Sequence, residues 1–383
     1  MSELNASNLR KEHGNEGPNL VGITTLTSQH YMVPPSGNTA DRPQNPQPGT
    51  LRFNTDIGSL EYFKGNVMGW ESINRISPNI GISTLATTKS GQGTGARGCT
   101  AGGNAPAFKN EIEFITISTF GDSQDFGNLV TASTGRSGCG SRTRGLLVGG
   151  NSTPGYINEI DMLTFSSTGS EADFGNMSIS NGYRASLSSQ IRGITAGGAS
   201  PLTDVIDYVT IASAGFTSQD FGNLSANREK PVAFQSTTRG IFAGGTQPSA
   251  VNTIEYITIA STGNAIDFGD CHTALVASAG CSNATRGIIK ERYQPGYTDS
   301  MSYITIATKG NSSDFGNFIN NSGGIAPMAS PTRAVFAGGY GHPAFRADIG
   351  SVEIATTGDA LDFGDISYGA DHIGGCSNAH GGL

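Results

Sequence analysis

Asp-Phe-Gly is the pattern with the clearest possible chemistry, because the aspartate of such a tripeptide can hold a magnesium ion. It recurs at intervals of 47 or 48 residues, and its six aspartates are Asp125, Asp173, Asp220, Asp267, Asp314 and Asp362. One catalytic metal site does not need six copies. We therefore predict a structural role, in which each carboxylate accepts hydrogen bonds from backbone N–H groups of a turn and the glycine supplies a positive φ.

An arginine recurs with the same period, at the start of an apolar run that ends in two glycines, as in RGLLVGG and RGIFAGG. The six arginines are Arg97, Arg144, Arg192, Arg239, Arg286 and Arg333. They could form a ring that binds anions. Because arginine suits buried bidentate pairing with carboxylates, we predict instead that they pair with aspartate and hold each repeat together. The fifth repeat departs from the pattern, with Glu291 and Arg292 in place of the two glycines.

The sequence offers little for catalysis or metal binding. None of its six histidines stands four residues from another, and neither a GxSxG nor an HExxH motif occurs. The five cysteines form no CxxC pair, so we expect them to be small buried hydrophobic residues. We predict no catalytic residue, no metal site and no cofactor, and hence a protein that is not an enzyme.

Short strands are the elements that must carry the repeated residues. Glycine makes up 55 of 383 residues, and each repeat has a β-branched and aromatic stretch such as IEYITIAS. Three or four strands fit into each repeat, and so small a sheet can bury its faces only by stacking on its neighbours. We predict an all-β chain in which residues 93–383 form a six-bladed β-propeller.

The repeat resembles the kelch repeat, which has an apolar strand ending in Gly-Gly, a strand with an aromatic residue, and a turn to a second aromatic residue. Kelch blades usually place tryptophan at the second aromatic position, where this chain has phenylalanine, as at Phe126 and Phe268. We expect these rings to fill space between blades. The segment SQDFGN, at 123–128 and 218–223, also resembles part of the structural Asp-box hairpin of sialidase-type propellers.

The N-terminal part of the chain has a different composition. Five prolines fall within residues 34–50, and we predict that residues 1–49 are an extended, proline-rich attachment arm. Residues 50–75 alternate around TDIG and end in NVMGWESI, which predicts a small module of a β-hairpin and a third short strand. Residues 76–92 are expected to be a linker.

Residues 21–66, from VGITTLTSQHYM to LEYFKGN, resemble the N-terminal segment of fibre-like virion proteins of tailed phages, especially phages of marine cyanobacteria. Repeats such as IDYVTIAS with RGIFAGG are similar to the distal parts of such proteins. The resemblance implies a structural protein of the virion, made in the host cytoplasm. It also implies that residues 1–75 attach to other virion proteins and that the chain forms homo-oligomers, often trimers.

Loops after the glycine pairs are the expected place for contacts with a ligand, because loops vary while the strands hold them. Two are richest in aromatic and charged residues, and their candidate binding residues are Arg292, Tyr293, Tyr297, Tyr340, His342, Phe345 and Arg346. Such side chains suit a host surface glycan or another virion protein. A carbohydrate-binding or polysaccharide-degrading propeller and a kelch-type protein-interaction scaffold are alternatives.

Charge and hydropathy argue against two other classes of partner. The net charge of −8 does not suit a protein that neutralises nucleic-acid phosphates. Nowhere do 18 apolar residues run together, so we expect no membrane span.

Overall fold

The computed structural model describes residues 34–56, 59–66, 69–72, 96–292 and 296–383. The chain divides into two compact units, Met1–Ile76 and Ser77–Leu383. Most of the predicted arm, residues 1–33, and the predicted linker, residues 76–92, lie outside the described residues.

The first unit is a four-stranded sheet in the order β1-β2-β3-β4. Its elements are β1 (Ser36–Gly37), the 3-10 helix η1 (Thr39–Asp41), β2 (Leu51–Asn54), β3 (Ser59–Phe63) and β4 (Trp70–Ser72). The predicted hairpin is confirmed as the antiparallel pair β2–β3, and the third strand as β4. Part of the proline-rich segment joins this sheet, because β1 pairs with β2 in parallel.

A buried ion-pair cluster takes the place of a large apolar core in this small sheet. Glu61 is fully buried, and its carboxylate accepts a hydrogen bond of 2.6 Å from Arg42 and lies 3.6 Å from Arg52. The hydrogen bond from Arg42 lowers the pKa of Glu61. Nearby, the Phe63 and Trp70 rings pack with their centroids 5.5 Å apart.

Among its described residues, the second unit contains six sheets with four main antiparallel strands each and one two-stranded sheet, so the prediction of an all-β chain is confirmed. One strand at the end of each sheet contacts the corresponding strands of neighbouring sheets, and we call these the inner strands. They are β8 (Ser137–Gly140), β12 (Ala185–Ser188), β17 (Val232–Gln235), β22 (Ala279–Ser282), β26 (Ala326–Ala329) and β32 (Gly374–Ser377).

Next to each inner strand lies the strand that begins with the repeated arginine. These are β5 (Arg97–Ala101), β9 (Arg144–Val148), β13 (Arg192–Ala196), β18 (Arg239–Ala243), β23 (Arg286–Arg292) and β27 (Arg333–Ala337). The β-branched and aromatic stretches form the third strands, which are β6 (Glu111–Thr116), β10 (Glu159–Thr164), β14 (Val205–Thr210), β20 (Ser249–Thr258), β24 (Tyr297–Thr305) and β30 (Asp348–Glu353).

The Asp-Phe-Gly tripeptides lie in the fourth strands, which we call the outer strands. They are β7 (Gln124–Asn128), β11 (Ala172–Asn176), β16 (Gln219–Asn223), β21 (Ile266–Leu275), β25 (Ser313–Asn317) and β31 (Leu361–Asp365). Four two-residue strands complete the unit, namely β15 (Phe216–Thr217), β19 (Thr246–Gln247), β28 (Tyr340–Gly341) and β29 (Ala344–Phe345).

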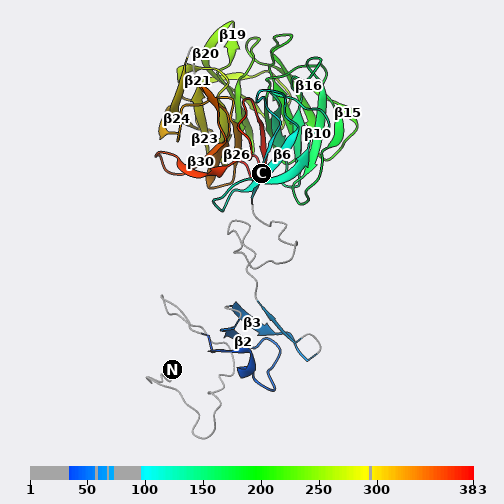
Figure 1. The fold of residues 1–383 in the computed structure, drawn as a ribbon, viewed down its shortest axis with the longest axis vertical. Coiled ribbons are helices and arrows are strands. Elements are labelled where there is room, and N and C mark those ends of the chain that lie inside the picture. The colour runs from blue at the N-terminus through cyan, green and yellow to red at the C-terminus, as the bar shows by residue number, and fades with distance from the viewer. Residues whose placement is uncertain (1–33, 57–58, 67–68, 73–95, 293–295) are drawn as a thin grey trace, which may run out of the picture. The chain divides into compact units, whose positions relative to one another are not determined.

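One sheet combines the two ends of this unit, because β32 pairs with β5 in the order β32-β5-β6-β7. Contacts between inner strands run from β8 to β12, β17, β22, β26 and β32, and β32 in turn contacts β8. Figure 1 shows this unit, coloured from cyan at β6 to red at the C-terminal end of the chain. The expectation that the C-terminal segment lies near Arg97 is confirmed, since the Asn378 N–H donates to the Arg97 carbonyl.

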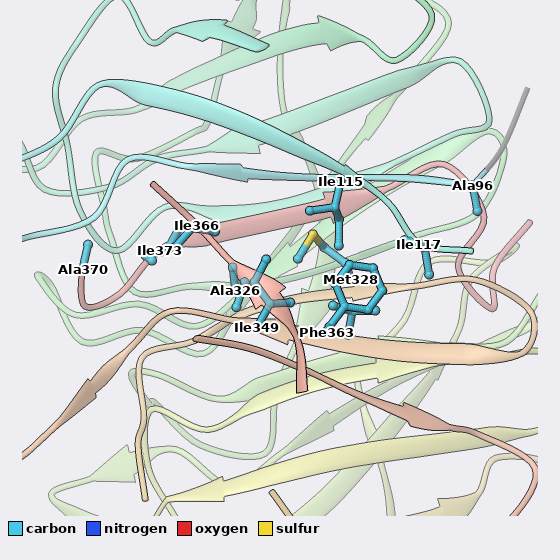
Figure 2. Packing of buried hydrophobic residues seen from close by; sticks show 12 residues of the cluster. Ala96, Ile115, Ile117, Ala326, Met328, Ile349, Phe363, Ile366, Ala370 and Ile373 are labelled. Atoms are coloured by element: carbon cyan, nitrogen blue, oxygen red, sulfur yellow. The ribbon is translucent and has the colours of Figure 1, made fainter. Parts of the chain in front are cut away.

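In five repeats the repeated arginine is followed by a glycine, which leaves room for a side chain from the preceding sheet; the sixth repeat has Ala334 there. A Cβ on Gly98 would lie 2.6 Å from the Met328 sulfur, and one on Gly240 would lie 2.7 Å from Leu187. Figure 2 shows Met328 beside Ile115 in the cluster that joins the last and first repeats. The five cysteines are buried and free, as expected from the sequence.

The outer strands are joined to the next sheet at the Asp-Phe-Gly tripeptide. In all six copies the phenylalanine ring is buried and its carbonyl accepts a hydrogen bond from a glycine N–H of the following repeat; the last pair is Phe363 with Gly121 of the first repeat. The tripeptide glycine has the predicted positive φ, such as 146° at Gly222. A Cβ on Gly222 would lie only 2.4 Å from the Gly263 carbonyl oxygen. This glycine therefore permits a close backbone approach between sheets.

We expect Gly222→Ala to lower the free energy of unfolding by about 2 kcal/mol, because alanine would be strained at this φ and would push against the Gly263 carbonyl. Urea unfolding of the full chain measures the change. Gly155→Ala is the matched control, since a Cβ there meets nothing within 4 Å, and its effect should stay within about 0.5 kcal/mol. Equal effects of the two substitutions would contradict a junction at Gly222.

Candidate functional site

The six repeated aspartates are not turn-forming residues, so that prediction is wrong. Each lies within an outer strand with its side chain exposed, and no hydrogen bond to any of these carboxylates occurs among the described residues. The strand pairing explains the difference, because the third strand pairs with the aspartate and with the glycine but skips the phenylalanine between them, so the aspartate is a paired strand residue beside a bulge. Within the described ranges, no group of three or more potential metal ligands comes together.

The six repeated arginines join neighbouring sheets through backbone carbonyls, so the predicted pairing with aspartate is wrong as well. Arg144 Nη1 donates to the Ile211 carbonyl at 2.9 Å, and the equivalent bond of Arg333 reaches Ile117 of the first repeat, also at 2.9 Å. Five of the six guanidinium groups also lie over an aromatic ring, as Arg97 does over Phe114 at 4.3 Å. They are structural links and do not form an anion site.

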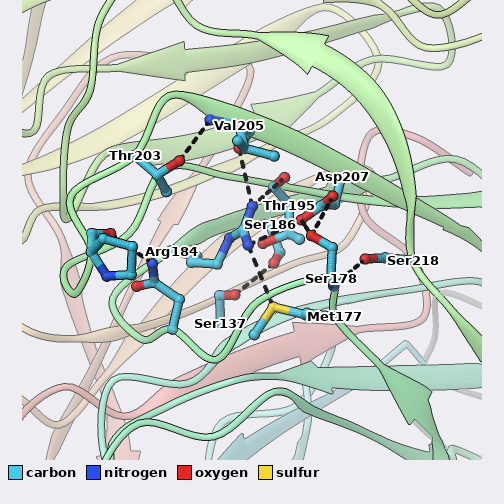
Figure 3. A network of polar contacts seen from close by, with 12 residues as sticks. Ser137, Met177, Ser178, Arg184, Ser186, Thr195, Thr203, Val205, Asp207 and Ser218 are labelled. Carbon is cyan, nitrogen blue, oxygen red and sulfur yellow. Dashed lines mark hydrogen bonds and ion pairs between the residues drawn. The ribbon is translucent and has the colours of Figure 1, made fainter.

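A second set of charged residues, which the sequence analysis missed, lies inside the sheets. Arg228 and Glu255 pair at 2.9 Å with both side chains about 1–2% exposed. Arg184 and Asp207 pair at 3.1 Å, within the network shown in Figure 3. The sequence does mark the acidic partners of these pairs, because an aspartate or glutamate interrupts the apolar stretch of the third strand in IEF, IDM, IDY and IEY.

The fifth repeat replaces this acid with Ser302 and carries a buried lysine instead. The Lys290 amine donates to three backbone carbonyls, those of Glu291, Thr298 and Ser322. Burial lowers the pKa of Lys290 to about 7, and nearby Asp299 and Glu291 oppose that shift. The buried lysine therefore links its own strand β23 to β24 and to the segment at Ser322.

The two aromatic loops predicted to bind a ligand come together. The Arg292 guanidinium lies 4.7 Å from the Tyr297 ring, and the Tyr297 and Tyr340 rings are 5.7 Å apart. Tyr340 in turn contacts Phe345 at 5.3 Å, and its hydroxyl lies 3.4 Å from His342 Nδ1. We call these five residues the loop cluster. Arg346 is partly buried and its Nε has no partner among the described residues, and Tyr293 lies outside them.

A cavity of about 110 Å³ opens between the inner strands at the end of the sheets that carries these loops. Two residues before each inner strand stands a residue with a positive φ, and all six line the cavity: Gly135, Tyr183, Lys230, Ala277, Gly324 and His372. A left-handed conformation costs an L-residue about 1 kcal/mol, and glycine avoids this cost. Tyr183, Lys230 and His372 therefore occupy strained positions at the cavity.

Residues 380–383 lie between the opposite ends of the inner strands. His380 Nε2 lies 2.7 Å from the Gly140 carbonyl, while Nδ1 lies 2.6 Å from Gln235 Nε2 and accepts from the Gly382 N–H at 3.1 Å. These partners define a neutral imidazole with its proton on Nε2. Burial lowers the pKa of His380 to about 4, while the hydrogen bond to Gly140 opposes the shift.

Comparison with known proteins adds no family to this description. No protein-family model and no curated protein sequence matches the chain. Within the described ranges, none of the helices has the length and apolar character needed to cross a membrane.

Proposed function

We propose that the chain is a non-enzymatic structural protein of a tailed-phage virion, a fibre or fibre-like appendage. Its N-terminal residues 1–75 would attach to other virion proteins, and its second unit would be displayed toward a host surface or another virion protein. The observation that carries this proposal is the convergence of two aromatic loops at one end of the second unit. The chain enters that unit at the opposite end, where Ala96 precedes β5.

The architecture proposed for the displayed unit is a six-bladed, kelch-like β-propeller. The six four-stranded sheets, the contact order of the inner strands and the pairing of β32 with β5 support it. Two cyclic sets of contacts between sheets support it further, one made by the repeated arginines and the other by the Asp-Phe-Gly tripeptides. Such a unit would hold its loops rigidly for recognition.

The proposed attachment can be tested on virions. We expect immunogold labelling with an antibody against residues 96–383 to mark the particles. A chain lacking residues 1–75 should be absent from particles and should behave as a soluble monomer, whereas the full chain should form an oligomer, with a trimer expected. Particles without label, or incorporation that does not depend on residues 1–75, would contradict the proposal.

Carbohydrate binding is the second candidate function, favoured by the loop cluster and the cavity beside it. Exposed aromatic rings with adjacent polar groups are suited to sugar recognition. Binding of this kind is compatible with display on a virion.

A further inference from the structure

One side of the cavity mouth is an aromatic wall. The Tyr183 ring extends over Gly135, where a Cβ would lie 2.6 Å from the ring, and reaches the His372 ring at 5.0 Å. The Tyr156 ring packs against the Tyr183 ring, with the two ring centroids 6.4 Å apart, and the Lys230 amine lies 4.8 Å from the Tyr183 ring centroid. The glycine at position 135 thus allows two large side chains from non-adjacent repeats to meet.

The opposite side of the mouth is open and leads to the loop cluster. Ala277 and Gly324 present almost no side chain to the cavity there. Ser278, which also lines the cavity, accepts a hydrogen bond of 2.8 Å from the Arg292 N–H through its hydroxyl. The mouth is therefore a shallow site between the Tyr183 wall and the Arg292 side chain stacked on Tyr297.

The polar groups at this site favour an anionic ligand. The residues lining the cavity include Arg136, Arg184, Lys230 and His372 but no aspartate or glutamate. The two arginines are neutralised by buried carboxylates behind them. Lys230 pairs with the partly exposed Glu229 at 3.7 Å, and its ammonium group also lies over the Tyr183 ring at 4.8 Å. Partly exposed ion pairs of this kind are weak. The Lys230 ammonium group can therefore pair with an incoming carboxylate.

His372 shapes the wall beside Tyr183. Its Nδ1 lies 2.9 Å from the Asp371 carboxylate, which fixes the ring orientation. Its Nε2 is buried and has no hydrogen-bond partner among the described residues, so the ring borders the site without offering the ligand a polar contact. The cavity volume of about 110 Å³ is below the roughly 300 Å³ of a pocket for a drug-sized ligand, so it suits a single small unit.

We propose that the mouth binds one sugar ring that carries a carboxylate, such as the hexuronic acid of an acidic polysaccharide. The apolar face of the ring packs on Tyr183, and the carboxylate pairs with Lys230. This inference rests on the proposed display function, because it names the surface chemistry that the displayed unit recognises.

Saturation-transfer NMR and calorimetry of the full chain test the site with sodium glucuronate, glucose and sodium acetate. We expect glucuronate to bind with a millimolar Kd, at least 10-fold more tightly than glucose, and acetate not to bind measurably. Equal binding of glucose would overturn the role of the carboxylate, and equal binding of acetate would overturn the role of the sugar. No binding of glucuronate would overturn the proposal as a whole.

Tyr183→Gly and Lys230→Gly locate the site without adding backbone strain, because glycine adopts their positive φ angles of 56° and 55° more easily than the native residues. We expect Tyr183→Gly to weaken glucuronate binding at least 10-fold. Lys230→Gly should abolish the preference for glucuronate over glucose. Phe216→Ala, at an exposed ring in β15 that does not line the cavity, is the matched control and should bind as the unaltered chain does. Unchanged binding by both glycine variants would refute the site.

These measurements are independent of virion attachment. Glucuronate binding by a protein that is absent from particles would contradict the display function alone. Labelled particles together with a protein that does not bind glucuronate would contradict the saccharide site alone.

Discussion

Replacing Arg228 with alanine is expected to lower the free energy of unfolding by about 3 to 5 kcal/mol. Arg228 is fully buried; its guanidinium forms an ion pair with Glu255 at 2.9 Å and donates a hydrogen bond of 3.2 Å to the Gly244 carbonyl. Removing it leaves the Glu255 carboxylate, itself about 1% exposed, without its charged partner. The size of the effect comes mainly from that unpaired charge, because an intact buried pair often contributes little net stability.

Urea unfolding with a double-mutant cycle tests this explanation. Glu255→Gln in the Arg228→Ala background should recover a large part of the loss, since the uncompensated charge is then removed. Glu353→Ala is a matched control at an exposed pair, in which Glu353 lies 3.3 Å from Arg333 and is 57% exposed, and it should cost less than about 1 kcal/mol. A loss at Arg228→Ala no larger than this control would contradict the assignment.

Acidification is expected to weaken the second unit through His380. The pKa of this histidine is lowered from 6.5 to about 4 in the folded chain, so between these values the unfolded chain binds a proton that the folded chain does not. The stability is therefore complete above pH 6.5 and falls as the pH decreases toward 4. At 1.36 kcal/mol per pH unit, the loss amounts to about 3 kcal/mol.

Titration of Glu171 changes the free energy of unfolding in the opposite direction within the same pH range. Burial raises its pKa from 4.5 to about 7, so its contribution is present at low pH and is lost as the pH rises toward 7. The clean test is therefore a comparison between the unaltered chain and His380→Gln, by urea unfolding at pH 4.5, 5.5, 6.5 and 7.5. The difference in unfolding free energy should change by about 1.4 kcal/mol per pH unit below 6.5. Parallel curves would show that His380 does not titrate in this way.

The repeat pattern in the sequence predicts the all-β fold because it marks the apolar positions that every repeat buries. A phenylalanine equivalent to Phe268 recurs every 47 or 48 residues, and all six of these side chains are buried. Cys139 and Cys281 share a position with Leu187 and Met328, and all four are buried, as an interchangeable apolar position requires. Alternation around TDIG likewise predicts the β2–β3 hairpin, because a turn and its flanking strands are local in sequence.

Contacts between repeats could not be predicted in the same way. Arg239 donates to the carbonyls of Ile306 and Ala307, and a backbone carbonyl has no residue identity that a sequence pattern could reveal. Aspartate was therefore the obvious but incorrect partner. The cavity residues Tyr183, Lys230 and His372 were missed for a related reason. They occupy equivalent positions but differ in type, so no repeated letter marks them.

The pairing of β32 with β5 has a consequence for synthesis on the ribosome. The sheet that contains the first repeated strands receives its inner strand from residues 374–377, so it stays incomplete until translation has passed that point. Until then one edge of β5 has no partner strand, and such an edge invites pairing with other chains. A nascent or prematurely terminated chain is thus distinguishable from a finished one by its exposed β5 edge. A chain that stops before residue 374 lacks the strand that completes this sheet.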